Sequence, residues 1–207
     1  MPSLERLQDT RGTVGTTRIE IDHLGYEGDL TSKHHRNLPL LIRCATEWPE
    51  RVYYRLHLAE TLLGLDRTAD ALAAGHAGIA LAQRSGTARS RIDGAVLCQL
   101  LAAHQLRNGT DSLDLIEAGL ALHPENYGLL LTLAQRNLQH GNAETSLVIA
   151  RKLQAIDPDT LTPGLIAYDR DIFGRHAVAM EIAGLSRLGR KGEAAAVLAR
   201  TARSAAR

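Results

Sequence analysis

The chain has 207 residues, of which 44% are hydrophobic and 3% aromatic, and its 24 basic and 23 acidic side chains give a net charge of +1. A chain of this length and hydrophobicity can bury a continuous core, and its near-neutral charge excludes a strong electrostatic attraction to nucleic acid or to anionic lipid. Ala and Leu dominate the composition, which favours closely packed helices, so we expect an all-α protein.

From the sequence we expect neither an export signal nor a membrane span. Residues 1–18 are rich in Thr, Gly and Arg without an apolar centre, and no run of about 18 apolar residues occurs. Cys44 and Cys98 lie far apart within apolar helical patterns, where buried reduced thiols are commoner than a disulfide or a metal pair. We therefore expect a cytoplasmic protein that binds neither nucleic acid nor membrane.

The first predicted element is a short β-strand at residues 17–22. Ile19 and Ile21 alternate with polar residues there, which is typical of a strand. No second strand is predicted to pair with it, and a lone strand is not stable by itself. Either it pairs with another chain, as in a homodimer, or its natural sheet is absent. Residues 1–35 are thus predicted to be an N-terminal segment with this strand and a turn, partly flexible.

The predicted strand leads to His23-Leu-Gly-Tyr26, then to Lys33 and to Arg36-Asn-Leu-Pro-Leu-Leu-Ile42, where a helix is expected. This order resembles the exit from the catalytic domain in family-2 glycosyltransferases that carry C-terminal repeats. The resemblance implies a link to a glycosyltransferase system. The catalytic domain of that family is a long N-terminal α/β region with an Asp-x-Asp metal motif, and only 16 residues precede the strand here. We therefore expect no catalytic domain.

Residues 36–207 are predicted to form one domain of about four helical hairpins. Apolar residues recur there at helical spacing, and Gly, Asn or Asp marks the turn inside each hairpin. The predicted helix pairs are Val52–Leu63 with Ala69–Ala82, Ile92–Leu106 with Ser112–Leu122, two helices between Pro124 and Pro158, and Ala177–Leu188 with Glu193–Ala202.

The hairpins carry a repeated spacing. His-Pro-Glu-Asn at 123–126 recurs as Asp-Pro-Asp at 157–159, and the two prolines are 34 residues apart, which is the period of tetratricopeptide repeats. Small residues are expected where second helices approach their neighbours, at Ala71, Ser112, Ser146 and Ala194. Their spacing places extra residues in loops at 84–90 and 159–173. The chain therefore resembles a degenerate tetratricopeptide protein, which implies a right-handed superhelix with a groove that binds protein or peptide.

No pattern of residues predicts catalysis. Neither a Gly-x-Ser-x-Gly elbow nor a phosphate-binding Gly-x-x-x-x-Gly-Lys loop occurs, and the nine histidines lack the spacing of metal ligands. The Asp-x-Asp matches at 157–159 and 169–171 fall in a helix stop and in a loop between hairpins. We therefore predict that the chain is no enzyme by itself and has no cofactor and no metal site.

The first helices of the hairpins are expected to line the groove with their outward faces. The partner-binding residues predicted by helical spacing are Tyr53, His57, Glu60, His104, Gln105, Gln135, Gln139, His176 and Arg187. Two functions follow. The first is a noncatalytic scaffold that binds a protein or peptide, associated with a glycosyltransferase system. The alternative is a C-terminal fragment or split subunit of a family-2 glycosyltransferase, active only with a separate catalytic domain.

Overall fold

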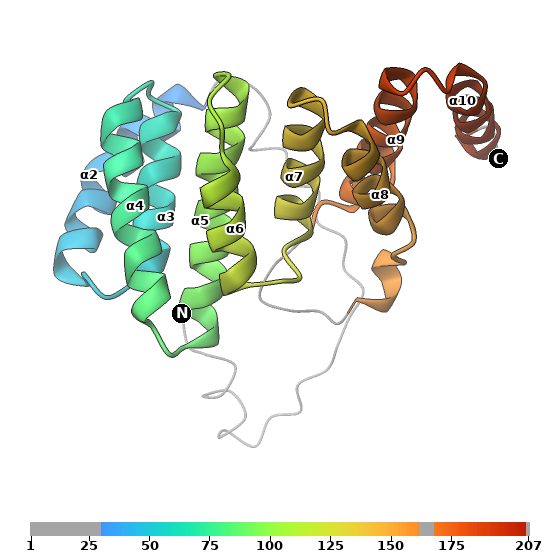
Figure 1. Ribbon diagram of the computed structural model, residues 1–207. Helices are drawn as coiled ribbons and strands as arrows, with labels where there is room; N and C mark the ends of the chain where they lie inside the picture. The colour runs from blue at the N-terminus through green and yellow to red at the C-terminus, as the bar shows by residue number, and fades with distance from the viewer. Residues whose placement is uncertain (1–29, 162–167, 206–207) are drawn as a thin grey trace. The chain divides into compact units, whose positions relative to one another are not determined.

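The computed structural model describes residues 30–161 and 168–205, and all the regular structure in these ranges is helical (Figure 1). The all-α prediction is confirmed for this part of the chain. The strand predicted at residues 17–22, and the homodimer predicted through it, lie outside the described residues. The elements are α2 (Thr31–Glu47), α3 (Val52–Leu63), α4 (Thr68–Arg84), α5 (Ala88–Arg107), α6 (Leu113–Leu122), α7 (Tyr127–Gln139), α8 (Ala143–Gln154), the 3-10 helices η2 (Pro158–Thr160) and η3 (Arg170–Ile172), α9 (Arg175–Arg187) and α10 (Lys191–Ala205).

Helices α3 to α10 pair into four successive hairpins. The observed ends of α3 coincide with the predicted ones. For the other helices whose ends were predicted, the observed and predicted ends differ by at most four residues. Helices that are neighbours along the chain contact each other: the two helices of each hairpin do so, and the second helix of one hairpin contacts the first helix of the next. The first helices α3, α5, α7 and α9 also contact one another in order. None of the described helices is both long and apolar enough to cross a membrane.

The four hairpin turns share one hydrogen-bond pattern. Each has a residue with positive φ, and the N–H of the following residue donates to the carbonyl five residues earlier, which is the Schellman motif that ends a helix. The positive-φ residues are Asp66 (57°), Gly109 (71°), Gly141 (83°) and Gly189 (73°). The bonds run from Arg67 to Leu62, Thr110 to Gln105, Asn142 to Asn137 and Arg190 to Leu185, at 2.8 to 2.9 Å.

Three of the four predicted small residues occupy equivalent places after these turns. Ala71, Ser146 and Ala194 lie in the first turns of α4, α8 and α10, and all three are buried. The prediction for Ser112 was wrong in position, because Ser112 is the N-cap of α6 and precedes the helix. α6 starts four residues after its positive-φ residue, Gly109, whereas α4, α8 and α10 start two residues after theirs, so Ile116 donates to the Ser112 carbonyl where a small residue was expected.

Two helices begin earlier than the sequence predicts. α2 starts at Thr31, so His34 and His35 lie inside a helix that was expected only after them. α5 starts at Ala88 and not at Ile92, because the side chain of Thr87 accepts a hydrogen bond from the Ser90 N–H and caps the helix. The extra residues expected in a loop at 84–90 therefore lengthen α4 and α5, and only residues 85–87 connect these helices.

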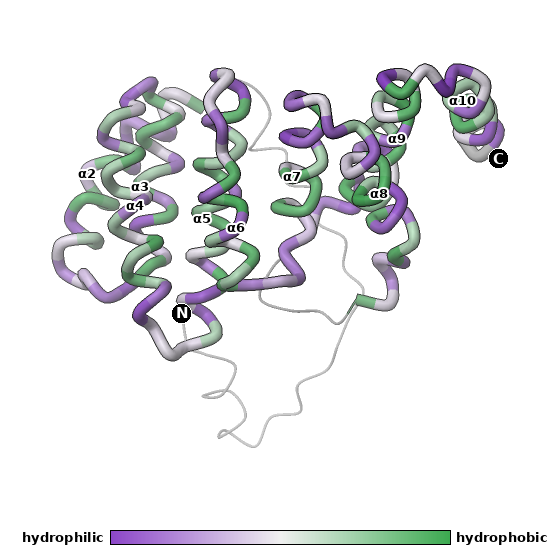
Figure 2. Tube along the Cα trace, viewed as in Figure 1, coloured by the Kyte–Doolittle hydropathy of each residue, from purple (hydrophilic) through white to green (hydrophobic). Residues whose placement is uncertain are grey.

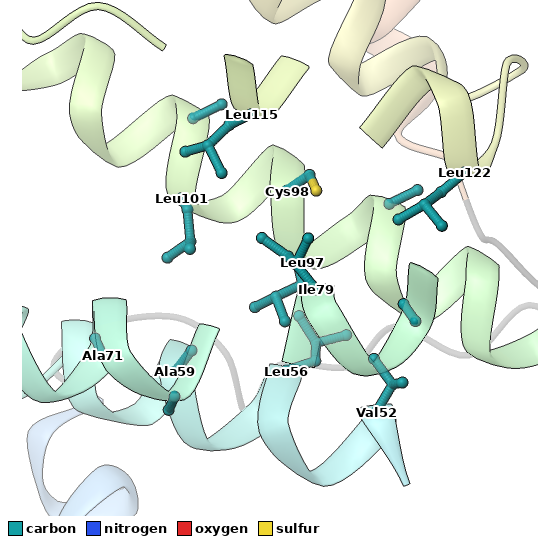
Figure 3. Close-up of a cluster of buried hydrophobic side chains, with 14 of the residues drawn as sticks. Val52, Leu56, Ala59, Ala71, Ile79, Leu97, Cys98, Leu101, Leu115 and Leu122 are labelled. Atoms are coloured by element: carbon teal, nitrogen blue, oxygen red, sulfur yellow. The ribbon is translucent and has the colours of Figure 1, made fainter. Parts of the chain in front are cut away.

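The core lies where the hairpins meet. Most helices contain both hydrophobic and hydrophilic residues along their length, so each can direct an apolar face toward the core (Figure 2). One buried cluster reaches from α2 to the start of α7 and includes Leu56, Ile79, Leu97 and Leu101 (Figure 3). Separate clusters join α8 to α9 and α10 around Leu185, and α8 to η3 and α9. The described core is thus divided within the third hairpin, because α7 contributes Leu129 to the large cluster while α8 belongs to the other two.

Candidate functional site

The nine predicted groove residues lie on α3, α5, α7 and α9, and each is at least partly exposed. On α3, His57 contacts both Tyr53 and Glu60. The ring centroids of Tyr53 and His57 are 4.3 Å apart, and His57 Nδ1 lies 3.0 Å from Glu60 Oε2. This hydrogen bond is the main cause that lowers the pKa of Glu60 below its usual value, so the carboxylate is charged at neutral pH.

The other six predicted residues do not form a shared cluster. His104 lies 3.1 Å from Asn108 on its own helix end, and His176 lies 3.6 Å from Asp169. In the described part of the chain, no hydrogen bond or ring contact joins the predicted residues of one hairpin to those of the next. Their joint role as a groove therefore stays a prediction. Among these six residues, four have side chains without a hydrogen bond or ion pair to a described residue: Gln105, Gln135, Gln139 and Arg187.

A cleft of about 970 Å³ opens where the start of α3, the end of α4 and the start of α5 meet; we call it the α3–α5 cleft. Tyr53 is its one member from the predicted groove. Val52 and Leu81 belong to its apolar wall and also pack in the large hydrophobic cluster, so the cleft opens directly from the core. Its lining residues are Glu50, Arg51, Val52, Tyr53, Tyr54, Leu81, Arg84, Ser85, Thr87, Arg89, Ser90 and Asp93.

The connection between α4 and α5 forms the polar edge of the cleft. Ser85 Oγ accepts the Thr87 N–H at 3.3 Å, and Thr87 Oγ1 accepts the Ser90 N–H at 3.2 Å. These two side-chain caps fix the backbone of a short connection that contains Gly86. The start of α5 and the end of α4 are therefore held in place on either side of the cleft.

Three arginines line the α3–α5 cleft. The side chains of Arg51 and Arg84 form no hydrogen bond or ion pair with any described residue. Arg89 is held by Asp93, whose two carboxylate oxygens lie 3.0 and 3.1 Å from its Nε. The side chain of Asp93 is 7% exposed, whereas that of Arg89 is 51% exposed. The buried carboxylate thus fixes an arginine that still reaches solvent.

Sequence reasoning missed these arginines because it assigned residues 84–90 to an insertion between hairpins. The signal in the sequence was the density of polar residues in Arg-Ser-Gly-Thr-Ala-Arg-Ser at 84–90. Nothing in that stretch showed that Arg51, about thirty residues earlier, would lie on the same cleft. Their proximity depends on how α3 packs against α4 and α5.

A second polar cluster joins the third hairpin to the fourth. The buried carboxylate of Glu181 on α9 accepts hydrogen bonds from Arg151 Nε at 2.8 Å and from Gln154 Nε2 at 3.0 Å, both on α8. Arg200 Nη2 on α10 lies 3.5 Å away. A cavity of about 570 Å³ lies beside this cluster and is lined mainly by apolar parts of α9. Because both oxygens of the Glu181 carboxylate already have partners, the cluster fits a structural role.

Two other groups of side chains are of a kind that can bind metal or react. Asp169, Asp171 and His176 come within 4.8 Å of one another. They already interact with neighbours, since Asp171 pairs with Arg175 at 2.6 Å and Asp169 with His176 at 3.6 Å. Both cysteines are free, as expected, and burial raises the pKa of the Cys98 thiol to about 12, which keeps it protonated and unreactive.

The chain matches no protein-family model, no curated protein and no solved structure.

Proposed function

We propose that the chain is a noncatalytic scaffold that binds a peptide or an extended segment of a protein. In this proposal the hairpins form a tetratricopeptide-like right-handed superhelix. The shared turn pattern and the ordered contacts between successive hairpins support the proposal, because stacked hairpins of equal geometry present a continuous surface built from rigid helices.

The observation that carries the proposal is the α3–α5 cleft. It combines a cavity of about 970 Å³ with an exposed aromatic side chain, Tyr53, and with hydrogen-bonding side chains at its edge. Pockets that bind ligands are typically concave and mainly apolar, with a few polar groups that fix orientation, and tyrosine is common among residues that dominate binding energy. Ser85, Thr87 and Ser90 supply hydroxyl groups that can accept or donate to a peptide backbone.

Selection from a displayed library of random peptides tests this function. We expect the full chain to enrich peptides whose affinity falls about tenfold in Tyr53→Ala, since a central tyrosine contributes more than 1 kcal/mol to typical interfaces. Val148→Ala is the matched control, because Val148 on α8 is also exposed and apolar but lies outside the cleft. Equal binding by both variants, or no enriched peptide, would contradict the proposal.

The noncatalytic part of the proposal has its own test. The purified full chain is incubated with nucleotide sugars, and released nucleotide is measured. We expect no turnover. Turnover that copurifies with the chain through several steps would show that the scaffold assignment is wrong.

A further inference from the structure

We propose that the α3–α5 cleft binds an acidic peptide, in which a carboxylate meets the arginines and an adjacent apolar side chain enters the apolar part of the cleft. This inference rests on the proposed function and specifies its ligand. The cleft residues that carry it are Arg51, Arg84 and Arg89 for the carboxylate, and Val52, Tyr54 and Leu81 for the apolar side chain.

Charge complementarity is the first argument. Arg51 and Arg84 have no anionic partner among the described residues, although most other arginines of the hairpins are paired. Arginine presents N–H groups in a planar fork that matches the two oxygens of a carboxylate. The guanidinium groups of Arg51 and Arg84 line the same cleft, near an apolar wall with less access to water, and this favours a carboxylate ligand.

The fixed position of Arg89 is the second argument. Asp93 accepts only from Nε, so both Nη groups of Arg89 keep their donors. The Arg89 guanidinium also lies 5.8 Å from the centre of the Tyr53 ring, within the range of a cation–π contact. An arginine held from two sides loses less side-chain entropy when it binds, and this favours a specific contact.

The charges of the whole cleft select the class of ligand. Asp93 and Glu50 also line it, so its three arginines face two carboxylates. This small positive excess matches one carboxylate, and it is too small to balance a densely charged chain such as nucleic acid. Val52, Leu81 and the rings of Tyr53 and Tyr54 supply the apolar wall. The complementary ligand is therefore an apolar side chain next to a carboxylate.

Fluorescence anisotropy with the full chain tests the inference. The probe is a labelled peptide of alternating Glu and Leu with an amidated C-terminus, and its comparison peptide has Gln in place of Glu. We expect the acidic probe to bind at least about tenfold more tightly and to weaken as salt is raised. A third peptide, with Gln and Leu but a free C-terminus, distinguishes a terminal carboxylate from side-chain carboxylates as the source.

Variants locate the binding site. We expect Arg84→Ala and Arg51→Ala each to weaken binding of the acidic probe about three- to tenfold, since charge-assisted hydrogen bonds are roughly twice as strong as neutral ones. Arg107→Ala is the matched control, because Arg107 is an exposed arginine on α5 outside the cleft. Circular dichroism checks that all three variants are folded.

The outcomes separate this inference from the proposed function. Equal affinity for the Glu and Gln peptides, or equal loss in Arg107→Ala, overturns the inference. Failure of every carboxylate probe to bind also overturns it. If the display library then yields neutral peptides that depend on Tyr53, the scaffold function stands with another ligand; if it yields none, both fail.

Discussion

At the scale of single residues, Glu181 is a buried carboxylate whose oxygens accept from Arg151 and Gln154. In Glu181→Gln, an amide NH₂ group would replace one of these oxygens and would face the donor of either Arg151 or Gln154. We expect the free energy of unfolding to fall by about 1–3 kcal/mol, the usual cost when a buried hydrogen bond to a charged group is lost. Urea unfolding followed by circular dichroism measures it.

Glu193→Gln is the control for this substitution. Glu193 pairs with Arg190 at 2.6 Å but is exposed, and exposed ion pairs contribute little, so we expect no measurable change. If the two variants lose equal stability, the burial of Glu181 is not what makes its contacts important.

The same carboxylate predicts a dependence of stability on pH. Burial raises the pKa of Glu181, but the hydrogen bonds from Arg151 and Gln154 and the nearby positive charges outweigh it, so the pKa lies below its usual 4.5. A group with a lowered pKa in the folded state stabilises that state above its unfolded-state pKa. This contribution is lost as the pH falls through the folded-state pKa.

We therefore expect the stability difference between the wild-type chain and Glu181→Gln to be constant from pH 7 to about pH 5 and to shrink at lower pH. Urea unfolding of both proteins at a series of pH values tests it. A difference that grows as the pH falls would mean that Glu181 is protonated in the folded chain.

Sequence patterns identified some single residues and not others. Ala71, Ser146 and Ala194 were predicted as small buried positions because helical spacing alone places them on the packed face. Arg51 and Arg84 were not predicted as neighbours, because they come from different helices whose approach depends on tertiary packing. Spacing along a helix is a local property, whereas a cleft between three helices is not.

At the scale of elements, the turn between α3 and α4 differs from the other three. Asp66 has a φ of 57°, where the others use glycine. A side chain in this left-handed conformation is strained, although aspartate tolerates it better than most residues. We expect Asp66→Gly to raise the free energy of unfolding by about 0.5–1 kcal/mol in chemical denaturation. Gly141→Ala, which introduces the strain, should lower it by a similar amount.

Glycines also mark the places where helices cross closely. A Cβ added to Gly94 on α5 would lie 2.3 Å from Ala82 Cβ on α4, and the short alanine side chain has no flexible end that can move away. We expect Gly94→Ala to destabilise the chain by about 1–3 kcal/mol in thermal and urea unfolding. Gly192→Ala on α10 should act in the opposite direction, because its Cβ would meet no atom within 4 Å and alanine favours the helix.

Most helix ends were predictable because local residues set them. Gly141 and Gly189 end helices through their own backbone conformation, so they are visible in the sequence. The start of α5 was missed, since Thr87 was assigned to a loop and its capping bond to Ser90 was not considered. The early start of α2 was missed for another reason: His34 packs against the end of α3 at Gly64, which is a contact between helices.

At the scale of the whole chain, the resemblance to family-2 glycosyltransferases depends on motifs at residues 17–42, of which residues 17–29 lie outside the described residues. A link to such a system therefore stays a prediction. The described helices instead show how the packing is distributed: successive hairpins contact each other, and the buried core is divided within the third hairpin, between α7 and α8. In such an array, stability depends on each hairpin and on its contacts with its neighbours.

This distribution predicts that damage to the last hairpin stays local. Leu185 on α9 and Leu97 on α5 are both fully buried, so replacing either by alanine removes a similar amount of apolar contact and costs about 2–5 kcal/mol. In Leu185→Ala we expect amide hydrogen exchange in α9 and α10 to accelerate by roughly 30-fold or more while α3 to α5 are unchanged. Leu97→Ala should accelerate exchange in α3 to α6. Mass spectrometry of the two variants measures both patterns. Uniform acceleration along the whole chain in Leu185→Ala would instead mean that the four hairpins unfold as one cooperative unit, which the divided core does not favour.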